Sequence, residues 1–188
     1  MKLILLRHGK TEANEKHLYC VFRDLPLSEA GIAELRELKN TIAYPDIAGY
    51  RVVTSGMRRC DDTLEIIFGD TRHEVEPDPR EMNFGRFEMH SYEEMKNDPE
   101  YIAWISGDND ANLTPGGESG NQMKARVLAV LERLLEDGRD ALLVVHGGVI
   151  AAIMERLFPD EGKNRYEWQP KIGRGYIVDT AKREYTTV

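Results

Sequence analysis

Short apolar runs and longer amphipathic stretches alternate along this chain. Residues 2–7 and 51–55 are rich in Leu, Ile and Val and have the length of short buried strands. Each is followed by apolar residues at helical spacing, which predicts helices at about 29–42 and 57–68. Ser28 is placed to cap the first of these helices. A strand-helix-strand-helix order is typical of an α/β fold with a doubly wound, mostly parallel sheet.

The same alternation returns in the second half of the chain. Ser119 begins a sequence that fits a capping box, so a long amphipathic helix is expected to start there. The elements expected in this half are that helix, a strand at 141–145, a helix at about 149–157 and strands at 175–179 and 183–187. Together the two halves predict one domain over residues 1–188, a three-layer α/β/α sandwich.

Residues 77–118 break the pattern. Four prolines between positions 77 and 115, with many Asn, Asp and Gly residues, leave room only for short helical stretches near 92–96 and 100–106. An insertion of this kind in an α/β domain is often a lid. We therefore expect residues 77–118 to form an inserted helical lid over the ends of the strands.

Charge and cysteine content exclude several classes of protein. The 25 Lys and Arg residues are outnumbered by 33 Asp and Glu residues, giving a formal charge of -8. No basic stripe is present, so nucleic acid and anionic membranes are poor candidates as partners. The apolar run at the N-terminus is too short for a signal peptide, and the two cysteines lack metal-binding spacing. These features predict a cytoplasmic protein without a metal; the oligomeric state stays open.

Two of the predicted strands deliver a histidine at their carboxyl end. His8 follows residues 2–7, and His146 follows residues 141–145. Ligands bind at this edge of open α/β sheets, so the two imidazoles are expected to share one site. Arg7 beside His8, the nearby glycine and Asn14 on a polar loop would suit an anion, because the arginine fork matches phosphate.

A third segment, residues 55–63, begins where a strand ends and a helix starts. Helix N-termini favour anions, so an arginine there would add to the same pocket. The alternative is that Arg58 and Arg59 pair with Asp61 and Asp62 in solvent. With two histidines nearby, at least one arginine is expected to point inward.

The segment Arg7 to Asn14 closely resembles the RHGxTxxN signature of the histidine phosphatase superfamily, which also contains the cofactor-dependent phosphoglycerate mutases. Within it, the chain is most similar to the small phosphatases that include α-ribazole phosphatase. Five further segments resemble motifs of the family in the same order: Pro26-Leu27-Ser28 with Gly31, Ser55 to Thr63, Arg80 to Gly85, Pro115 to Ser119, and His146-Gly147-Gly148. Six matches in order are hard to explain by chance.

The resemblance implies a role for each matched residue. His8 would attack phosphorus and form a phosphohistidine that water hydrolyses. The groups implied to hold the phosphoryl oxygens are Arg7, Arg59, His146 and the Gly147 amide. Glu81 would protonate the leaving alcohol and then deprotonate the attacking water. No metal or other cofactor is implied.

The residues expected to contact the rest of the substrate are Asn14, Cys20, Val21, Phe84 and Gly147. Cys20 and Val21 stand where the mutases carry a small Ser-Gly pair, which implies a more apolar pocket wall. Phe87-Glu88-Met89 replaces the Trp-Glu-Gly common in the small phosphatases. The predicted lid contains four large apolar side chains, those of Tyr92, Met95, Tyr101 and Trp104. These side chains either face the leaving group of the substrate or pack against one another.

Three functions are compatible with these motifs. The first is a metal-independent phosphomonoester hydrolase acting on a small phosphorylated metabolite, such as α-ribazole phosphate or a sugar or nucleoside phosphate. The second is a phosphoglycerate mutase, and the third is a phosphate-binding domain without activity. Between Glu81 and Ser119 only Arg86 and Lys96 carry positive charge, which favours hydrolysis over the mutase. The complete set of reactive residues argues against the third function.

Overall fold

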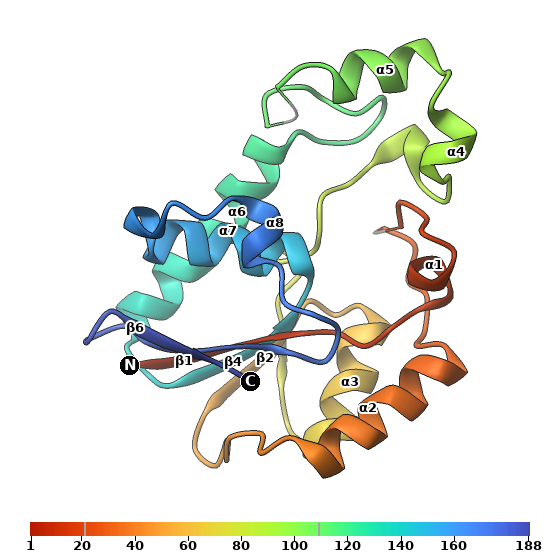
Figure 1. The fold of residues 1–188 in the computed structure, drawn as a ribbon. Helices are drawn as coiled ribbons and strands as arrows, with labels where there is room; N and C mark the ends of the chain where they lie inside the picture. The colour runs from red at the N-terminus through yellow and green to blue at the C-terminus, as the bar shows by residue number, and fades with distance from the viewer. Residues whose placement is uncertain (21, 109) are drawn as a thin grey trace.

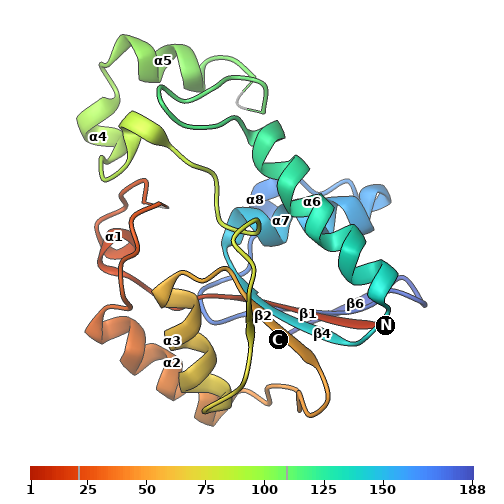
Figure 2. The same ribbon diagram turned by 180° about the vertical axis from the view of Figure 1, so that it is seen from behind.

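The computed structural model describes residues 1–20, 22–108 and 110–188. Within these ranges, six strands form one sheet in the order β3-β2-β4-β1-β5-β6, and helices cover both of its faces (Figures 1 and 2). The strands are β1 (Lys2–Arg7), β2 (Arg51–Thr54), β3 (Glu74–Val75), β4 (Ala141–Val145), β5 (Gly175–Asp179) and β6 (Glu184–Thr187). The first four run parallel, whereas β5 and β6 are antiparallel to their neighbours. The predicted α/β fold with a mostly parallel sheet is confirmed.

Alternate residues of the central strands build two separate cores. Leu3 and Leu5 of β1 pack into the core beneath α6 (Gly120–Asp137) and α7 (Gly147–Leu157). Ile4 and Leu6 of the same strand pack into the core beneath α2 (Glu29–Thr41) and α3 (Arg58–Phe68). β1 and β4 are therefore apolar on both faces, which explains their continuous apolar runs.

The predicted helix starts agree with the structure to within one residue, except at α7. The Ser28 hydroxyl accepts a hydrogen bond from the Gly31 amide at 3.0 Å, and Ser119 forms a capping box with Gln122. The helix α7, expected from about residue 149, begins at Gly147 instead. Glycine has a low helix propensity, so the apolar pattern does not predict that Gly147 and Gly148 belong to the helix. The last strand begins at Glu184 rather than residue 183, because Arg183 has a left-handed φ of 56°.

Three short helical elements outside the inserted segment were not predicted from the sequence: α1 (Glu12–Glu15), η2 (Pro159–Glu161) and α8 (Arg165–Trp168). Each has at most four residues, too few to show a helical period. Both α helices are held by side-chain caps, Thr11 on α1 and Asn164 on α8. In the part of the chain that is described, no helix is long and apolar enough to cross a membrane.

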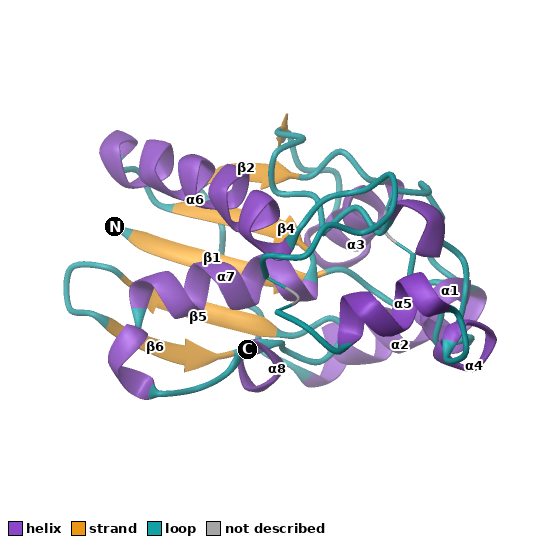
Figure 3. Cartoon of the chain, turned by 90° about the horizontal axis from the view of Figure 1, so that it is seen from above, coloured by secondary structure: helices purple, strands orange, loops and turns teal. Residues whose placement is uncertain are grey.

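Residues 77–118, here called the inserted segment, stand beyond the carboxyl ends of the parallel strands (Figure 3). They contain η1 (Gly85–Phe87), α4 (Tyr92–Met95) and α5 (Pro99–Ile105), so both expected helical stretches are present. Main-chain hydrogen bonds join Tyr19 to His90 and Met89, at 3.0 and 2.6 Å. The hydroxyls of Tyr19 and Tyr101 are 2.8 Å apart. The loop after α1 and the inserted segment are thus packed together, while the role of a lid stays a prediction.

Candidate active site

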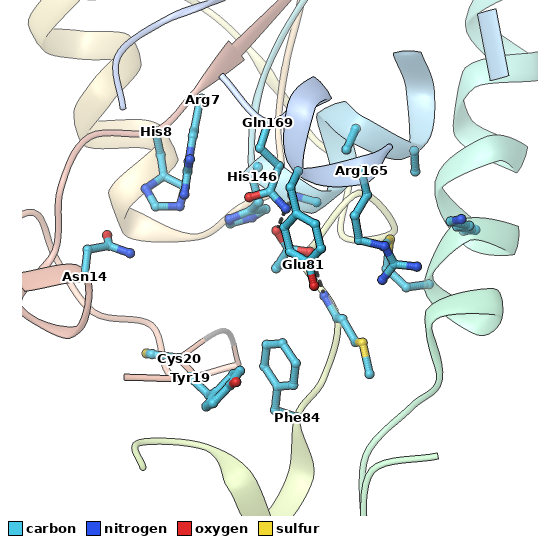
Figure 4. A pocket seen from close by; sticks show the side chains of 18 of the residues that line it. Arg7, His8, Asn14, Tyr19, Cys20, Glu81, Phe84, His146, Arg165 and Gln169 are labelled. Atoms are coloured by element: carbon cyan, nitrogen blue, oxygen red, sulfur yellow. Dashed lines mark hydrogen bonds between the residues drawn. The ribbon is translucent and has the colours of Figure 1, made fainter. Parts of the chain in front are cut away.

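The two strand-end histidines lie next to each other because β1 and β4 are neighbours in the sheet. The ring centroids of His8 and His146 are 5.0 Å apart, with an angle of 66° between the ring planes. Both side chains are almost fully buried. Figure 4 shows the two rings on one wall of a pocket, with Arg7 beside them. The two strands therefore bring both rings to one pocket.

Local contacts fix the chemical form of His8. Its Nδ1 lies 2.7 Å from the Gly9 carbonyl oxygen, which can only accept a hydrogen bond. Nδ1 therefore carries the proton, and Nε2 keeps its lone pair. Burial, followed by the positive charge of Arg59, lowers the pKa of His8 to about 3. His8 is a neutral imidazole with a free Nε2 at neutral pH.

His146 is held in the opposite tautomer. Its Nδ1 lies 3.4 Å from Nη2 of Arg59, which can only donate, so Nδ1 accepts. Its Nε2 then donates to the Ser55 hydroxyl at 2.9 Å, and that hydroxyl donates to the Cys60 sulfur at 3.3 Å. Burial and then the neighbouring His8 lower the pKa of His146 well below its usual value. These contacts make His146 a neutral support for the Arg59 guanidinium.

Two arginines bring positive charge to the histidines. Arg59 lies in the first turn of α3 and is only 2% exposed, whereas Arg58 is exposed and faces Asp62 at 3.7 Å. Arg7 donates from Nη1 to the Pro170 carbonyl at 2.8 Å. Its buried Nε has no hydrogen-bond acceptor among the described residues. Burial lowers the pKa of Arg7, and the nearby Glu81 carboxylate opposes this shift.

Glu81 enters the pocket from the start of the inserted segment. Its carboxylate accepts hydrogen bonds from the Gly148 amide at 2.7 Å and the Met82 amide at 3.2 Å. A Cβ atom on Gly148 would lie 2.3 Å from Glu81 Oε1, so only glycine leaves space for this carboxylate. Arg126 of α6 donates to the carbonyls of Arg80 and Glu81, at 2.5 and 2.8 Å, and pairs with Glu118. The backbone that carries Glu81 is thereby tied to α6.

The two histidines, Arg7, Arg59 and Glu81 line one cavity of about 600 Å³. The residues predicted from the sequence that line it are Arg7, His8, Asn14, Cys20, Arg59, Glu81, Phe84, His146 and Gly147. Val21 lies outside the described residues. A cavity of this size is much larger than a phosphate group and matches a small-metabolite site. Among the described residues, no three His, Cys, Asp or Glu side chains are grouped as around a metal ion.

Much of the outer part of the cavity was not predicted. The lining residues that were not predicted include Tyr19, Ile105, Met123, Lys124, Ala151, Ala152, Glu155, Arg165 and Gln169. Ala151 and Glu155 follow Gly147 at intervals of four, so they lie on the same face of α7. That spacing was the only signal for them in the sequence. Of the four apolar residues of the expected lid, Trp104 reaches the cavity, Tyr101 and Met95 are buried elsewhere, and Tyr92 is half exposed.

Comparisons with known proteins place the chain in one family. Residues 3–186 match the family model described as histidine phosphatase superfamily (branch 1). An adenosylcobalamin/alpha-ribazole phosphatase of Salmonella typhimurium is 31% identical over 185 residues, 95% of this chain and 90% of the relative. A 2,3-bisphosphoglycerate-dependent phosphoglycerate mutase of Bradyrhizobium diazoefficiens is 26% identical over 174 residues, 84% of this chain and 83% of the relative. A crystal structure from Escherichia coli, provisionally described as an alpha-ribazole-5'-P phosphatase, has a TM-score of 0.84 at 26% identity and covers 100% of this chain and 94% of its own.

Proposed function

The chain belongs to branch 1 of the histidine phosphatase superfamily and is an enzyme, and we propose that it hydrolyses phosphomonoesters through a phosphohistidine on His8. The observation that carries this proposal is the state of His8: a neutral ring whose Nδ1 is bonded to Gly9 and whose Nε2 has no hydrogen bond to any described residue. A buried imidazole in this form is a nucleophile that needs no base to activate it.

In the first step, Nε2 of His8 attacks phosphorus as the bond between phosphorus and the leaving oxygen breaks. Arg7, Arg59 and the Gly147 amide at the start of α7 supply donors for the phosphoryl oxygens. Because His146 accepts from Arg59, its own contact with a phosphoryl oxygen requires a proton on Nδ1 and stays a prediction.

Glu81 provides the proton transfers of both steps. As an acid it protonates the leaving oxygen, and as a base it then takes a proton from the water that attacks the phosphohistidine. This second attack breaks the N–P bond, releases inorganic phosphate and returns the lone pair to Nε2 of His8. The two amide hydrogen bonds to its carboxylate hold Glu81 in place for both transfers.

Hydrolysis is favoured over phosphoglycerate mutase activity. A mutase acts on a substrate with a second anionic group, which needs free cations near the site. Arg86 is engaged by Asp98 and Glu100, and Lys96 by Glu93, and neither lines the cavity. The two cations that line its outer part, Lys124 and Arg165, are each paired with a carboxylate. The substrate proposed here is the phosphomonoester of a small metabolite. The Salmonella relative makes α-ribazole phosphate the first compound to assay.

The proposal is tested by following phosphate release from p-nitrophenyl phosphate in the presence of a chelator. We expect the wild-type protein to turn over and His8→Asn to lose activity by roughly a thousandfold or more. Rapid quenching should trap an acid-labile phosphoenzyme in the wild type and none in the variant. His73→Asn is the control, since His73 lies outside the cavity.

Other outcomes would point to the alternatives. Interconversion of phosphoglycerates with little phosphate release would favour the mutase. Phosphate binding without turnover would favour the binding domain. Normal hydrolysis by His8→Asn would show that another group is the nucleophile.

A further inference from the structure

Four charged side chains meet at the end of the cavity opposite Asn14 and His8. Lys124 of α6 lies 3.1 Å from Glu155 of α7 and 3.2 Å from Asp110 of the inserted segment. Arg165 of α8 pairs with the same Asp110. We call these four residues the distal cluster. Figure 4 shows Arg165 on the side of the pocket away from Asn14.

The distal cluster carries no net charge, because its two cations are matched by two carboxylates. Lys124, Glu155 and Arg165 line the cavity, so a substrate that fills it meets this end. Each of the four side chains is only about a quarter to a third exposed. The cations are therefore occupied by protein carboxylates before any substrate arrives, and a second anion on the substrate would have to displace one of them.

Apolar side chains also line the cavity. Met123, Ala151, Ala152 and Trp104 line it. The inner end binds an anion through Arg7 and Arg59, whereas the outer end offers carboxylate oxygens that accept hydrogen bonds. Such a cavity fits a leaving group with an apolar body and a neutral, hydrogen-bonding far end.

We propose that Glu155 is a specificity-determining residue that rejects phosphomonoesters whose leaving group carries a second negative charge. This proposal rests on the proposed function and narrows its substrate class. Glu155 neutralises Lys124 and places its own charge against an incoming carboxylate or phosphate. Like-charge contact at such a site discriminates against the wrong ligand more than it strengthens the right one.

The test uses ω-hydroxyalkyl phosphates and ω-carboxyalkyl phosphates of matched length, in chains of about four to ten carbons, a range set by a cavity of ordinary ligand size. For chains that reach the distal cluster, the wild type should prefer the hydroxyl compound by about tenfold in kcat/KM. Glu155→Gln leaves the cluster with one excess positive charge, so the preference should shrink by about fivefold to tenfold. Lys124→Gln removes a positive charge, so the preference for the hydroxyl compound should increase.

The control variant is Glu132→Gln. Glu132 of α6 pairs with Arg156 of α7 at 3.0 Å, so it joins the same two helices as the Lys124–Glu155 pair, but it does not line the cavity. Its substrate preference should equal that of the wild type. Thermal unfolding of each variant checks that it is folded.

Each result decides one proposal. If both series are hydrolysed and neither Glu155→Gln nor Lys124→Gln changes the preference, Glu155 does not set specificity, while the phosphatase proposal stands. If the wild type hydrolyses no phosphomonoester at all, including p-nitrophenyl phosphate, the proposed function fails and the inference fails with it.

Discussion

At the scale of single residues, one side-chain type takes two chemical forms in this site. His8 and His146 follow neighbouring strands and are equally buried, yet the first donates from Nδ1 and the second accepts there. The difference comes from one partner each, a carbonyl for His8 and a guanidinium for His146. The hydrogen bond at one ring nitrogen thus determines whether the other nitrogen carries a proton or a lone pair.

Gly148 tests how closely Glu81 is held. Gly148→Ala should lower kcat by roughly a hundredfold, the usual size of a general acid-base contribution, because the new methyl group displaces the Glu81 carboxylate. The fold should remain, since alanine favours a helix over glycine by about 1 kcal/mol. Steady-state kinetics and thermal unfolding measure the two effects.

Glu81→Gln serves as the reference for this variant, because it removes the same carboxylate without crowding. The two variants should show similar losses in kcat. If Gly148→Ala retained full activity, the 2.7 Å hydrogen bond to the Gly148 amide would have no part in catalysis.

Some residues of the site could be predicted from the sequence and others could not. Arg7 and His8 could be selected because a strand end fixes where they lie, whereas only the family resemblance distinguished Arg59 from Arg58. Lys124 and Arg165 could not, because their place in the cavity depends on how α6 and α8 pack around α7. That packing leaves no local pattern in the sequence.

At the scale of elements, long regular segments were predictable and short ones were not. Strand β4 is a continuous apolar run, and α6 has both a period and a capping box. By contrast α1 and α8 each have four residues, and β3 has two, so their existence depends on caps and on neighbouring chain. The start of α7 was placed two residues late because two glycines precede its apolar face.

The link between α6 and the inserted segment is expected to matter for catalysis. Arg126→Met removes the donors to the Arg80 and Glu81 carbonyls and leaves Glu118 without this partner. We expect kcat to fall by roughly tenfold to a hundredfold, the loss that follows when a catalytic group moves by about 1 Å. Hydrolysis of p-nitrophenyl phosphate measures this loss.

Arg133→Met is the matched control, since Arg133 lies two turns further along α6. It pairs with Glu76 at 2.8 Å and with Asp78 of the inserted segment at 3.6 Å, and it does not line the cavity. Its kcat should stay close to that of the wild type. Equal losses in both variants would mean that α6 affects activity only through general stability.

At the scale of the whole molecule, the buried histidines connect the site to the stability of the fold. Both have a lowered pKa, and that of His8 falls from 6.5 to about 3. Between these values the unfolded chain binds a proton at position 8 that the folded chain does not. The free energy of unfolding therefore falls as the pH drops below about 6.5.

We expect the free energy of unfolding to fall by about 2 kcal/mol between pH 6.5 and pH 5 because of His8, since one pKa unit corresponds to about 1.4 kcal/mol. Urea unfolding at these two values measures the change. His8→Asn should lose less stability over this interval than the wild type. An identical pH dependence in His8→Asn and the wild type would mean that His8 is not held neutral.

The position of β1 in the sheet has a consequence for synthesis of the protein. This first strand lies between β4 and β5, so both of its partners come from the last third of the chain. While a ribosome makes the protein, the segment that ends in His8 waits unpaired until more than a hundred further residues have emerged. Long-range pairing of this kind slows folding and leaves apolar strands open to aggregation. Residues 2–7 are accordingly an apolar stretch that stays without its sheet partners for most of the time the chain takes to be made.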